Sequence, residues 1–389
     1  MKKILFDLKA IQPTSKNSAK FHGGGEYTKE LFLEIVDMNL SGLEIFYDQT
    51  LFMDDKILKK IKEKEIKINY IESIDDVQKL IKNGNYKLFI SFLPYTYFNL
   101  NFYNTKTLFT IHGLRAIEKP VDSYNLKYKK KSYDLIKFLL ISLFTKIYVN
   151  KQLKQFEKLL SKSTYVLVPS HHTKYSLKSF LPKLDIDKLI LLHSPIVKVS
   201  SISESYEKQF LNKYNLECKK YILLISTDRW IKNSYRAICA LNEIYNENNN
   251  VIKTVLVGDR RMMKHVEKKE NFICLDYLER DELEILYKNA FVFLYPTLNE
   301  GFGYPPIEAM KYGTLVLTSA VTSINEVCSD SVIYFNPYDV TEIKNRILMT
   351  LNEMCLQVDY NIKGKKRYEY LLNIQNIHIE GLIKLINKV

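Results

Sequence analysis

Residues 296–310 combine two acidic side chains with a loop that contains glycine and proline. Glu300 lies in the loop, and Glu308 follows on a predicted helix that begins near Pro305, since proline is favoured in the first turn of a helix. Carboxylates accept strong hydrogen bonds from hydroxyl groups, and backbone N–H groups at the start of a helix bind phosphate. The segment therefore predicts a site for a ligand with sugar hydroxyls and phosphate, rather than a turn with two surface glutamates.

Residues 227–233 place two cations after another apolar run and before a predicted helix. Arg229 and Lys232 can neutralise a diphosphate there, because guanidinium and ammonium groups form charge-assisted bonds with phosphate oxygens. A solvated loop without a ligand is the alternative. Trp230, the only tryptophan of the chain, is either a lid over a ligand or a packing residue.

Two features of the first half could also meet a ligand. Three glycines, residues 23–25, follow the first apolar run and precede a predicted helix, where their backbone can approach an anion closely. They match neither the P-loop nor the dinucleotide fingerprint, which argues against a nucleotide kinase and an NAD enzyme; a flexible turn is the alternative. His112 ends a further apolar run and could bind a substrate or transfer a proton, unless its role is structural.

Other polar clusters give weak signals for metal binding. Asp185 and Asp187 form an Asp-x-Asp pattern, but it precedes a strand instead of following one. His171 and His172 are adjacent, so their side chains point apart on a helix, and a capping or surface role is expected. The five cysteines lie in the second half without a Cys-x-x-Cys pair, which favours free thiols in a reducing cytoplasm. We expect neither a metal nor another cofactor.

The elements that must position these residues follow from the apolar runs. Short runs alternate with amphipathic helical patterns throughout, which predicts an α/β protein with parallel sheets covered on both faces. Strands are expected at 4–8, 43–47, 66–71, 87–92, 107–112, 164–169, 189–193, 221–226, 251–258, 272–275, 291–295 and 315–318. Helices are expected at 27–38, 74–82, 171–180, 233–245, 280–288 and 305–311.

The polar, serine-rich stretch at 195–206 predicts a domain boundary. Residues 1–198 and 199–389 would each form a Rossmann-like, doubly wound domain, with the last helix packing back on the first. Ligands of such sheets bind at the carboxyl ends of the strands, so the active site is expected in a cleft where the two domains face each other.

Together these residues resemble glycosyltransferase family 4, a retaining family with the GT-B fold. The most specific match is the element from Glu300 to Glu308, and the likeness continues to Val327. In the first half it rests on the triple glycine, His112 and residues 168–170.

The resemblance implies a role for each matching position. Glu308 would bind the ribose hydroxyls of the nucleotide, and Glu300 the hydroxyls of the transferred sugar. Arg229 and Lys232 would hold the diphosphate, and His112 would contact the donor sugar near the reacting carbon; Glu300, His112 and Lys232 are the expected catalytic residues. The further donor-binding positions would be Gly24, Gly25, Asn299, Gly301, Phe302 and Gly303.

Three positions depart from the family pattern. Ser226-Thr227 stand where glycine is usual, Ile231 where arginine is usual, and Gly113 where aspartate often follows the histidine. Arg229 is the candidate to replace the missing arginine. Without a metal, cations and helix dipoles would stabilise the leaving diphosphate, and the acceptor would attack from the same face.

The net charge of +13 lies entirely in the first half, where residues 1–200 hold 33 Lys and Arg against 20 Asp and Glu. Residues 127–158 concentrate nine lysines around an apolar stretch, which is typical of an element that lies on an anionic membrane surface. A solvated lysine face over a buried helix is the alternative. The N-terminal apolar run is too short for a signal peptide, and no stretch reaches the roughly 18 apolar residues of a membrane span.

The expected function is a retaining, metal-independent transfer of a hexose, such as mannose or rhamnose, from a nucleotide-diphosphate sugar to a glycan or lipid-linked glycan in polysaccharide or lipopolysaccharide synthesis. A sugar-nucleotide epimerase of the same fold is the alternative. Nucleic-acid binding is less favoured, because no recognised nucleic-acid module is present. We expect a cytoplasmic protein, peripheral at the inner face of the membrane, without a nucleic-acid partner.

Overall fold

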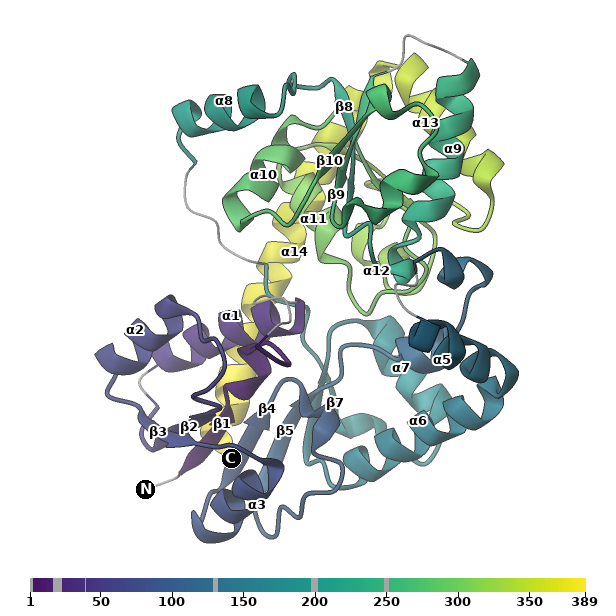
Figure 1. The fold of residues 1–389 in the computed structure, drawn as a ribbon. Coiled ribbons are helices and arrows are strands. Elements are labelled where there is room, and N and C mark those ends of the chain that lie inside the picture. The colour runs from purple at the N-terminus through teal and green to yellow at the C-terminus, as the bar shows by residue number, and fades with distance from the viewer. Residues whose placement is uncertain (1–2, 17–22, 39, 129–131, 197–201, 248–251) are drawn as a thin grey trace. The chain divides into compact units, whose positions relative to one another are not determined.

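The computed structural model describes residues 3–16, 23–38, 40–128, 132–196, 202–247 and 252–389 (Figure 1). The chain folds into two compact units, each described below by itself. Unit 1 comprises residues 1–114, 149–197 and 374–389, and unit 2 comprises residues 115–148 and 198–373.

Unit 1 is built on a parallel sheet of seven strands in the order β3-β2-β1-β4-β5-β6-β7. The strands are β1 (Ile4–Asp7), β2 (Leu43–Tyr47), β3 (Lys67–Tyr70), β4 (Leu88–Ser91), β5 (Lys106–Thr110), β6 (Tyr165–Val168) and β7 (Leu189–Leu191). The helices are α1 (Gly23–Asp37), α2 (Asp55–Glu63), α3 (Ile74–Asn83) and α7 (His171–Phe180). Every residue of β1, β2 and β4 is buried, as in sheets whose two faces are both covered.

Unit 2 contains a parallel sheet of six strands in the order β10-β9-β8-β11-β12-β13. The strands are β8 (Tyr221–Ile225), β9 (Lys253–Val257), β10 (Phe272–Leu275), β11 (Val292–Tyr295), β12 (Leu315–Ser319) and β13 (Ile333–Phe335). The helices are α4 (Arg115–Glu118), α5 (Ser132–Leu143), α8 (Glu204–Lys213), α9 (Ser234–Glu247), α10 (Arg280–Asn289), α11 (Tyr304–Lys311), α12 (Ile324–Cys328) and α13 (Val340–Asn352). Helices α9 and α13 pack together on one face of the sheet, and α10 and α11 lie on the other (Figure 1).

Two helices run from one unit into the other, α6 (Thr145–Ser161) and the long C-terminal α14 (Cys355–Lys388). Short 3₁₀ turns complete the chain: η1 (Lys9–Ile11), η2 (Pro94–Thr96), η3 (Ser123–Tyr128), η4 (Ile186–Lys188), η5 (Trp230–Lys232), η6 (Arg260–His265) and η7 (Lys269–Asn271). At the end of α14, Ile379, Leu382 and Ile386 join the core around β1 and α1 of unit 1.

The predicted fold class, two Rossmann-like α/β domains with parallel sheets, is confirmed. The twelve predicted strands differ from the observed ones by no more than two residues at either end, mostly because apolar runs extend past the last sheet hydrogen bond, and the edge strand β13 was not predicted. The predicted strand start at Val251 lies outside the described residues, as do residues 197–201 of the predicted linker. The glycines at 23–25 were predicted to precede the helix, but they form the first turn of α1.

The division into units differs from the predicted halves in residues 115–148, which belong to unit 2 although they precede residue 198. Tyr128 of this segment is part of the hydrophobic core around β8 and α9. Its hydroxyl contacts Ser234 Oγ at 3.2 Å and accepts the backbone N–H of Tyr235 at 2.6 Å. This segment therefore packs against the start of α9, next to the loop that follows β8.

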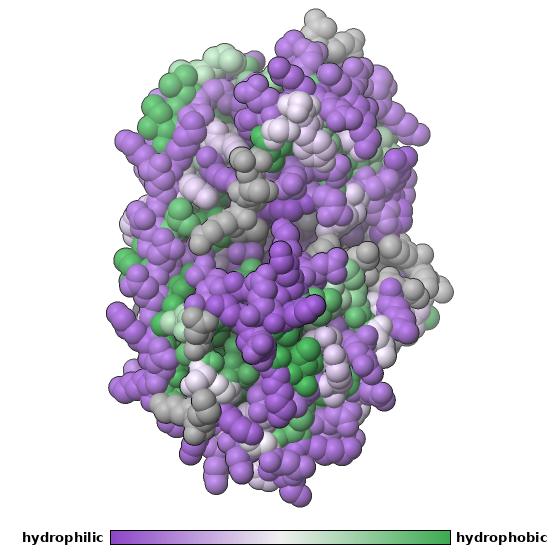
Figure 2. Space-filling view, turned by 90° about the vertical axis from the view of Figure 1, so that its left-hand side faces the viewer, coloured by the Kyte–Doolittle hydropathy of each residue, from purple (hydrophilic) through white to green (hydrophobic). Residues whose placement is uncertain are grey.

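The face shown in Figure 2 is largely hydrophilic, with smaller hydrophobic areas between the polar side chains. Within the described part of the chain, no helix is both long and apolar enough to cross a membrane.

Candidate functional site

The predicted site residues of unit 2 follow two neighbouring strands. The strand order of the sheet reverses between β8 and β11, and such a reversal leaves a crevice at the carboxyl ends of the strands. Arg229 and Lys232 come after β8, while Asn299 and Glu300 come after β11. The structure thus brings the two segments singled out in the sequence together at the place where doubly wound sheets bind ligands.

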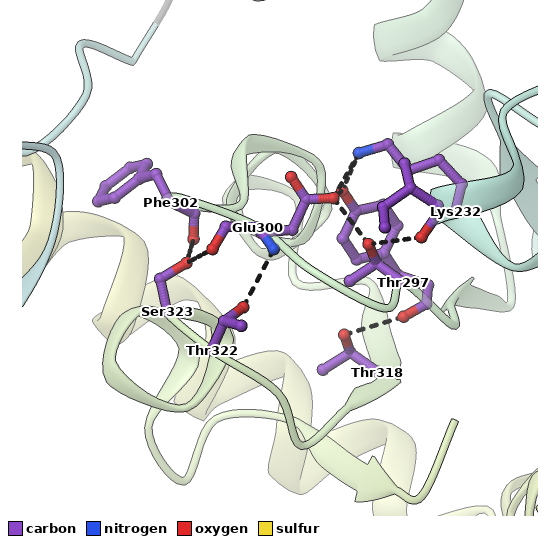
Figure 3. A network of polar contacts seen from close by, with 9 residues as sticks. Lys232, Thr297, Glu300, Phe302, Thr318, Thr322 and Ser323 are labelled. Carbon is purple, nitrogen blue, oxygen red and sulfur yellow. Dashed lines mark hydrogen bonds and ion pairs between the residues drawn. The ribbon is translucent and has the colours of Figure 1, made fainter. Parts of the chain in front are cut away.

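Glu300 is at the centre of a buried polar network (Figure 3). Its Oε1 atom accepts hydrogen bonds from Lys232 Nζ at 2.6 Å, Tyr295 Oη at 2.7 Å and Thr297 Oγ1 at 2.8 Å. Lys232 also donates to the Tyr295 hydroxyl at 2.5 Å. The three bonds to Glu300 converge on one carboxylate oxygen, Oε1, and Oε2 points away from the network (Figure 3).

The charges of this network are mutually stabilised. Burial by itself raises the pKa of the Glu300 carboxyl, but the positive charges of Lys232 and Arg115 and the hydrogen bonds to Glu300 outweigh it and lower the pKa to about 2. Burial lowers the pKa of the Lys232 ammonium, and the charge of Glu300 opposes this effect. Glu300 is therefore a carboxylate at neutral pH, able to accept a hydroxyl hydrogen bond through Oε2.

The turn between β12 and α12 holds the loop that carries Glu300. The backbone N–H of Glu300 donates to Thr322 Oγ1 at 3.0 Å, and Ser323 Oγ donates to the carbonyls of Glu300 and Phe302 (Figure 3). Gly303 has φ +107°, and a Cβ atom there would lie 2.5 Å from Ile324 Cδ1. The glycine is thus required both by the backbone conformation and by the close packing of α12.

Glu308 is placed by α11, which begins at Tyr304, one residue before the predicted Pro305. It is buried, and its Oε1 accepts a hydrogen bond from Arg280 at 2.6 Å. Arg280 also pairs with Glu284 on α10. Glu308, the predicted ribose-binding residue, is therefore held by Arg280 of the neighbouring helix α10. The sequence analysis did not identify this partner.

Two further predicted donor-binding residues have defined environments. Asn299 is buried, and its side-chain amide donates to Glu118 Oε2 of α4 at 2.7 Å. Arg229 is exposed at the start of η5, whereas Trp230 packs against the core beside α9, which favours its packing role over that of a lid. Gly301 and Phe302 lie in the loop between Glu300 and α11.

A second group of polar residues near the site was missed in the sequence. Asp122 accepts hydrogen bonds from both terminal nitrogens of Arg236 on α9, at 3.0 Å and 3.3 Å. Lys119 forms an ion pair with the same carboxylate. Asn299 and Glu118 are 181 residues apart in the sequence. Sequence patterns do not relate positions so far apart in the chain. Only the tertiary structure could reveal that residues 115–128 border the loops after β8 and β11.

The predicted residues of the first half lie in unit 1. Gly24 and Gly25 are in the first turn of α1, and a Cβ atom on Gly24 would lie 2.8 Å from Leu93 Cδ2. His112 Nε2 donates to the Phe92 carbonyl at 2.8 Å, which in the neutral ring puts the lone pair on Nδ1. Its ring also packs edge-on against Tyr27. These residues belong to a different unit from Glu300 and Lys232.

The weak metal signals have local structural explanations. Asp185 caps η4 by accepting the backbone N–H of Asp187 at 3.0 Å. His171 and His172 are the first residues of α7, next to the capping residue Ser170. In the described ranges, no three His, Cys, Asp or Glu side chains are grouped so as to hold a metal ion.

Comparison with known proteins agrees with this site. Residues 207–367 match the family described as "Glycosyl transferases group 1". The chain is 25% identical to the O-antigen chain mannosyltransferase RfbU of Salmonella typhimurium over 265 residues, 67% of this chain and 64% of that protein. It is 34% identical to the O-antigen chain mannosyltransferase B of Escherichia coli over 151 residues, 37% of this chain and 40% of that protein. It thus spans less than two thirds of either relative.

Solved structures show the same fold at low sequence identity. WaaG, described as a glycosyltransferase involved in lipopolysaccharide biosynthesis, aligns with a TM-score of 0.66 and 14% identity, over 97% of this chain and 98% of that one. HepE of Anabaena, solved with UDP-glucose, aligns with a TM-score of 0.69 and 12% identity, over 98% and 99% of the two chains.

The chain has the GT-B fold of glycosyltransferases. Residues 207–367, which contain Lys232, Glu300 and Glu308, match the group 1 glycosyltransferase family. The predicted resemblance is confirmed at this level, and membership of family 4 stays a prediction.

Proposed function

We propose that this protein transfers a hexose from a nucleotide-diphosphate sugar to a glycan or lipid-linked glycan of a cell-surface polysaccharide. The observation that carries the proposal is the ionised, buried Glu300, held by Lys232 at the strand-order reversal of a group 1 glycosyltransferase domain. Two relatives are named O-antigen mannosyltransferases, so mannose is the first sugar to test. HepE was solved with UDP-glucose, which supports a nucleotide-diphosphate donor.

In the proposed reaction, Glu300 binds the donor sugar. Its Oε2 accepts hydrogen bonds from sugar hydroxyls, while Oε1 stays bound to Lys232. Glu308 binds the ribose hydroxyls, and Arg280 orients its carboxylate. Such oriented groups act mainly by preorganisation, because their geometry is set before the substrate arrives.

The chemical step proposed is a retaining, metal-independent transfer. The acceptor oxygen bonds to the anomeric carbon on the face from which the diphosphate leaves, and a phosphate oxygen of the leaving group takes the hydroxyl proton. Cationic side chains near the loops after β8 and β11 stabilise the charge that develops on the diphosphate.

Ligand binding and turnover of site variants test this proposal. Glu300→Gln should lower the rate of sugar transfer from GDP-mannose or UDP-glucose about a hundredfold or more, since one oriented polar contact is worth that much. Glu308→Gln should weaken binding of the nucleotide about tenfold. Exposed Glu353→Gln is the matched control. Full activity of Glu300→Gln would remove Glu300 from the site.

The epimerase alternative makes a different prediction. An epimerase would convert the nucleotide sugar with no acceptor present, whereas the transferase should leave it intact. The comparisons give no support to the epimerase, because the relatives named above are mannosyltransferases.

We further propose that the protein meets an anionic lipid surface through α5. The structure exposes large apolar side chains along this helix and the start of α6: Tyr133, Leu135, Ile136, Leu139, Leu140, Leu143, Phe144 and Ile147. Leu143 is 76% exposed, whereas Phe138 is buried. This arrangement supports the membrane-surface interpretation over a buried helix beneath a solvated lysine face.

The charge around α5 favours an anionic bilayer as the occupant. Lys127, Lys137 and Lys146 are exposed in and next to this segment, and each lysine near an anionic surface contributes about 1 kcal/mol. Lys129, Lys130 and Lys131 lie outside the described residues. Such a position at the inner face of the cytoplasmic membrane would suit a lipid-linked acceptor.

Vesicle binding tests this contact. Leu143→Glu should abolish co-sedimentation with phosphatidylglycerol vesicles, and Lys137→Glu with Lys146→Glu should weaken it more in low salt than in high salt. Leu58→Glu, at an exposed leucine of α2, is the matched control. Unchanged vesicle binding of Leu143→Glu, or a change of oligomeric state instead, would contradict the proposal.

A further inference from the structure

The short helix α4 lies against the loop of the candidate site, although the sequence assigned no function to it. Glu118, its last residue, accepts the side-chain amide of Asn299 at 2.7 Å, next to Glu300. Four residues after Glu118, the buried Asp122 pairs with both Lys119 and Arg236. These contacts hold the C-terminal end of α4 beside the site.

Arg115, the first residue of α4, lies one helical turn before Glu118, so the two side chains lie on the same side of the helix. The positive charge of Arg115 acts on Glu300, Lys232 and the buried Tyr295. Arg115 therefore shares one electrostatic environment with the network in which Glu300 binds Lys232.

The side chain of Arg115 has hydrogen-bonding capacity to spare. In the part of the chain that the structure describes, it forms neither a hydrogen bond nor an ion pair, and its buried Nε atom has no hydrogen-bond partner. Glu300 does not satisfy it, because the bonds to Glu300 come from Lys232, Tyr295 and Thr297. An arginine held so close to a carboxylate that is already bonded is placed for a different anion.

The charge balance of the site indicates which anion fits. Lys232 and Glu300 neutralise each other, Glu118 adds one negative charge, and Arg115 and Arg229 add two positive charges, which leaves a net positive charge. Neither arginine pairs with an acidic side chain among the described residues. A diphosphate linkage carries about two negative charges at neutral pH, and the planar guanidinium group binds two phosphate oxygens side by side.

We propose that Arg115 is a donor-binding residue whose guanidinium group binds the diphosphate of the nucleotide sugar, and that the bond between Glu118 and Asn299 positions α4 for this contact. The inference deepens the proposed function and rests on it. A segment from the first half of the sequence thereby supplies a phosphate contact to the domain that carries the family motif.

Calorimetric titration of the full-length protein with UDP and GDP, and with UMP and GMP, tests this assignment. For the nucleotide that binds the wild type, Arg115→Gln should weaken diphosphate binding about tenfold or more, and monophosphate binding much less. The preference for diphosphate over monophosphate should therefore shrink. Compared with Arg115→Gln, Arg115→Lys should restore part of this preference, because lysine returns the positive charge but not the planar guanidinium group that binds two phosphate oxygens. Arg346→Gln, at a partly exposed arginine of α13, is the matched control.

The outcomes separate this inference from the proposed function. Wild-type protein that binds neither UDP nor GDP would refute the nucleotide-diphosphate donor, and the role of Arg115 with it. Normal binding by Arg115→Gln would overturn the role of Arg115 alone. Equal losses for diphosphate and monophosphate, with a lowered melting temperature, would also overturn it, because they indicate a structural role. Glu118→Gln should weaken diphosphate binding less than Arg115→Gln does.

Discussion

Replacement of Asp7 by asparagine should change how the stability of this protein depends on pH. Asp7 ends β1 and is 1% exposed, and its Oδ2 accepts hydrogen bonds from Ser91 at 2.7 Å and Tyr97 at 3.0 Å. Burial raises its pKa from 3.8 to about 6, although these hydrogen bonds work in the opposite direction. The folded protein therefore holds this proton more tightly than the unfolded chain does.

The sign and size of the effect follow from this difference. The stabilisation is fully present below about pH 3.8 and is lost as the pH rises through about 6; the difference corresponds to about 3 kcal/mol in total. Asparagine keeps the shape and an acceptor oxygen but does not titrate. The advantage of Asp7→Asn over the wild type should therefore grow by about 1–2 kcal/mol between about pH 5 and pH 7.5.

Urea denaturation of both proteins at several pH values measures this difference. Asp187→Asn, at an exposed position, controls for the loss of one negative charge. A stability difference between Asp7→Asn and the wild type that does not change with pH would refute the reasoning, as would one that falls as the pH rises.

Two other predictions concern the framework of unit 2. Gly303→Ala should lower the free energy of unfolding by about 1–3 kcal/mol, because φ is +107° and the new methyl group would meet Ile324; a melting temperature equal to that of the wild type would contradict this. Asp122→Ala should cost about 3–5 kcal/mol by leaving Arg236 buried without its counter-ion. A double-mutant cycle with Arg236→Ala should show strong coupling in chemical denaturation, and additive losses would indicate that the pair is not formed.

Much of the fold could be predicted because each strand of a parallel sheet is a short apolar run. In β8, all five residues from Tyr221 to Ile225 are buried, and the same stretch is apolar in the sequence. The loop after β11 was recognisable for a similar local reason, since Gly303 and Pro305 are required within a few residues of Glu300 and Glu308. Such requirements act over short stretches of chain and leave a pattern that can be read directly.

Helix α5 was harder to interpret. Its sequence is apolar almost throughout, so its pattern fits a buried helix as well as one that faces a lipid surface. The structure exposes Leu139, Leu140 and Leu143 and buries Phe138. Which side of an apolar helix is covered depends on where the preceding segment docks, and this is a property of the tertiary structure.

The sequence by itself determined the two α/β domains, the glycosyltransferase motif and the uneven distribution of charge, because these arise from residues close together in the chain. Only the tertiary structure decided that Lys232, Tyr295 and Thr297 all bind the same oxygen of Glu300, and that residues 115–128 lie beside the site. The contact between Glu118 and Asn299 depends on the path of the chain across 181 residues. Local patterns carry no information about such a path, because it is set by the packing of the whole domain.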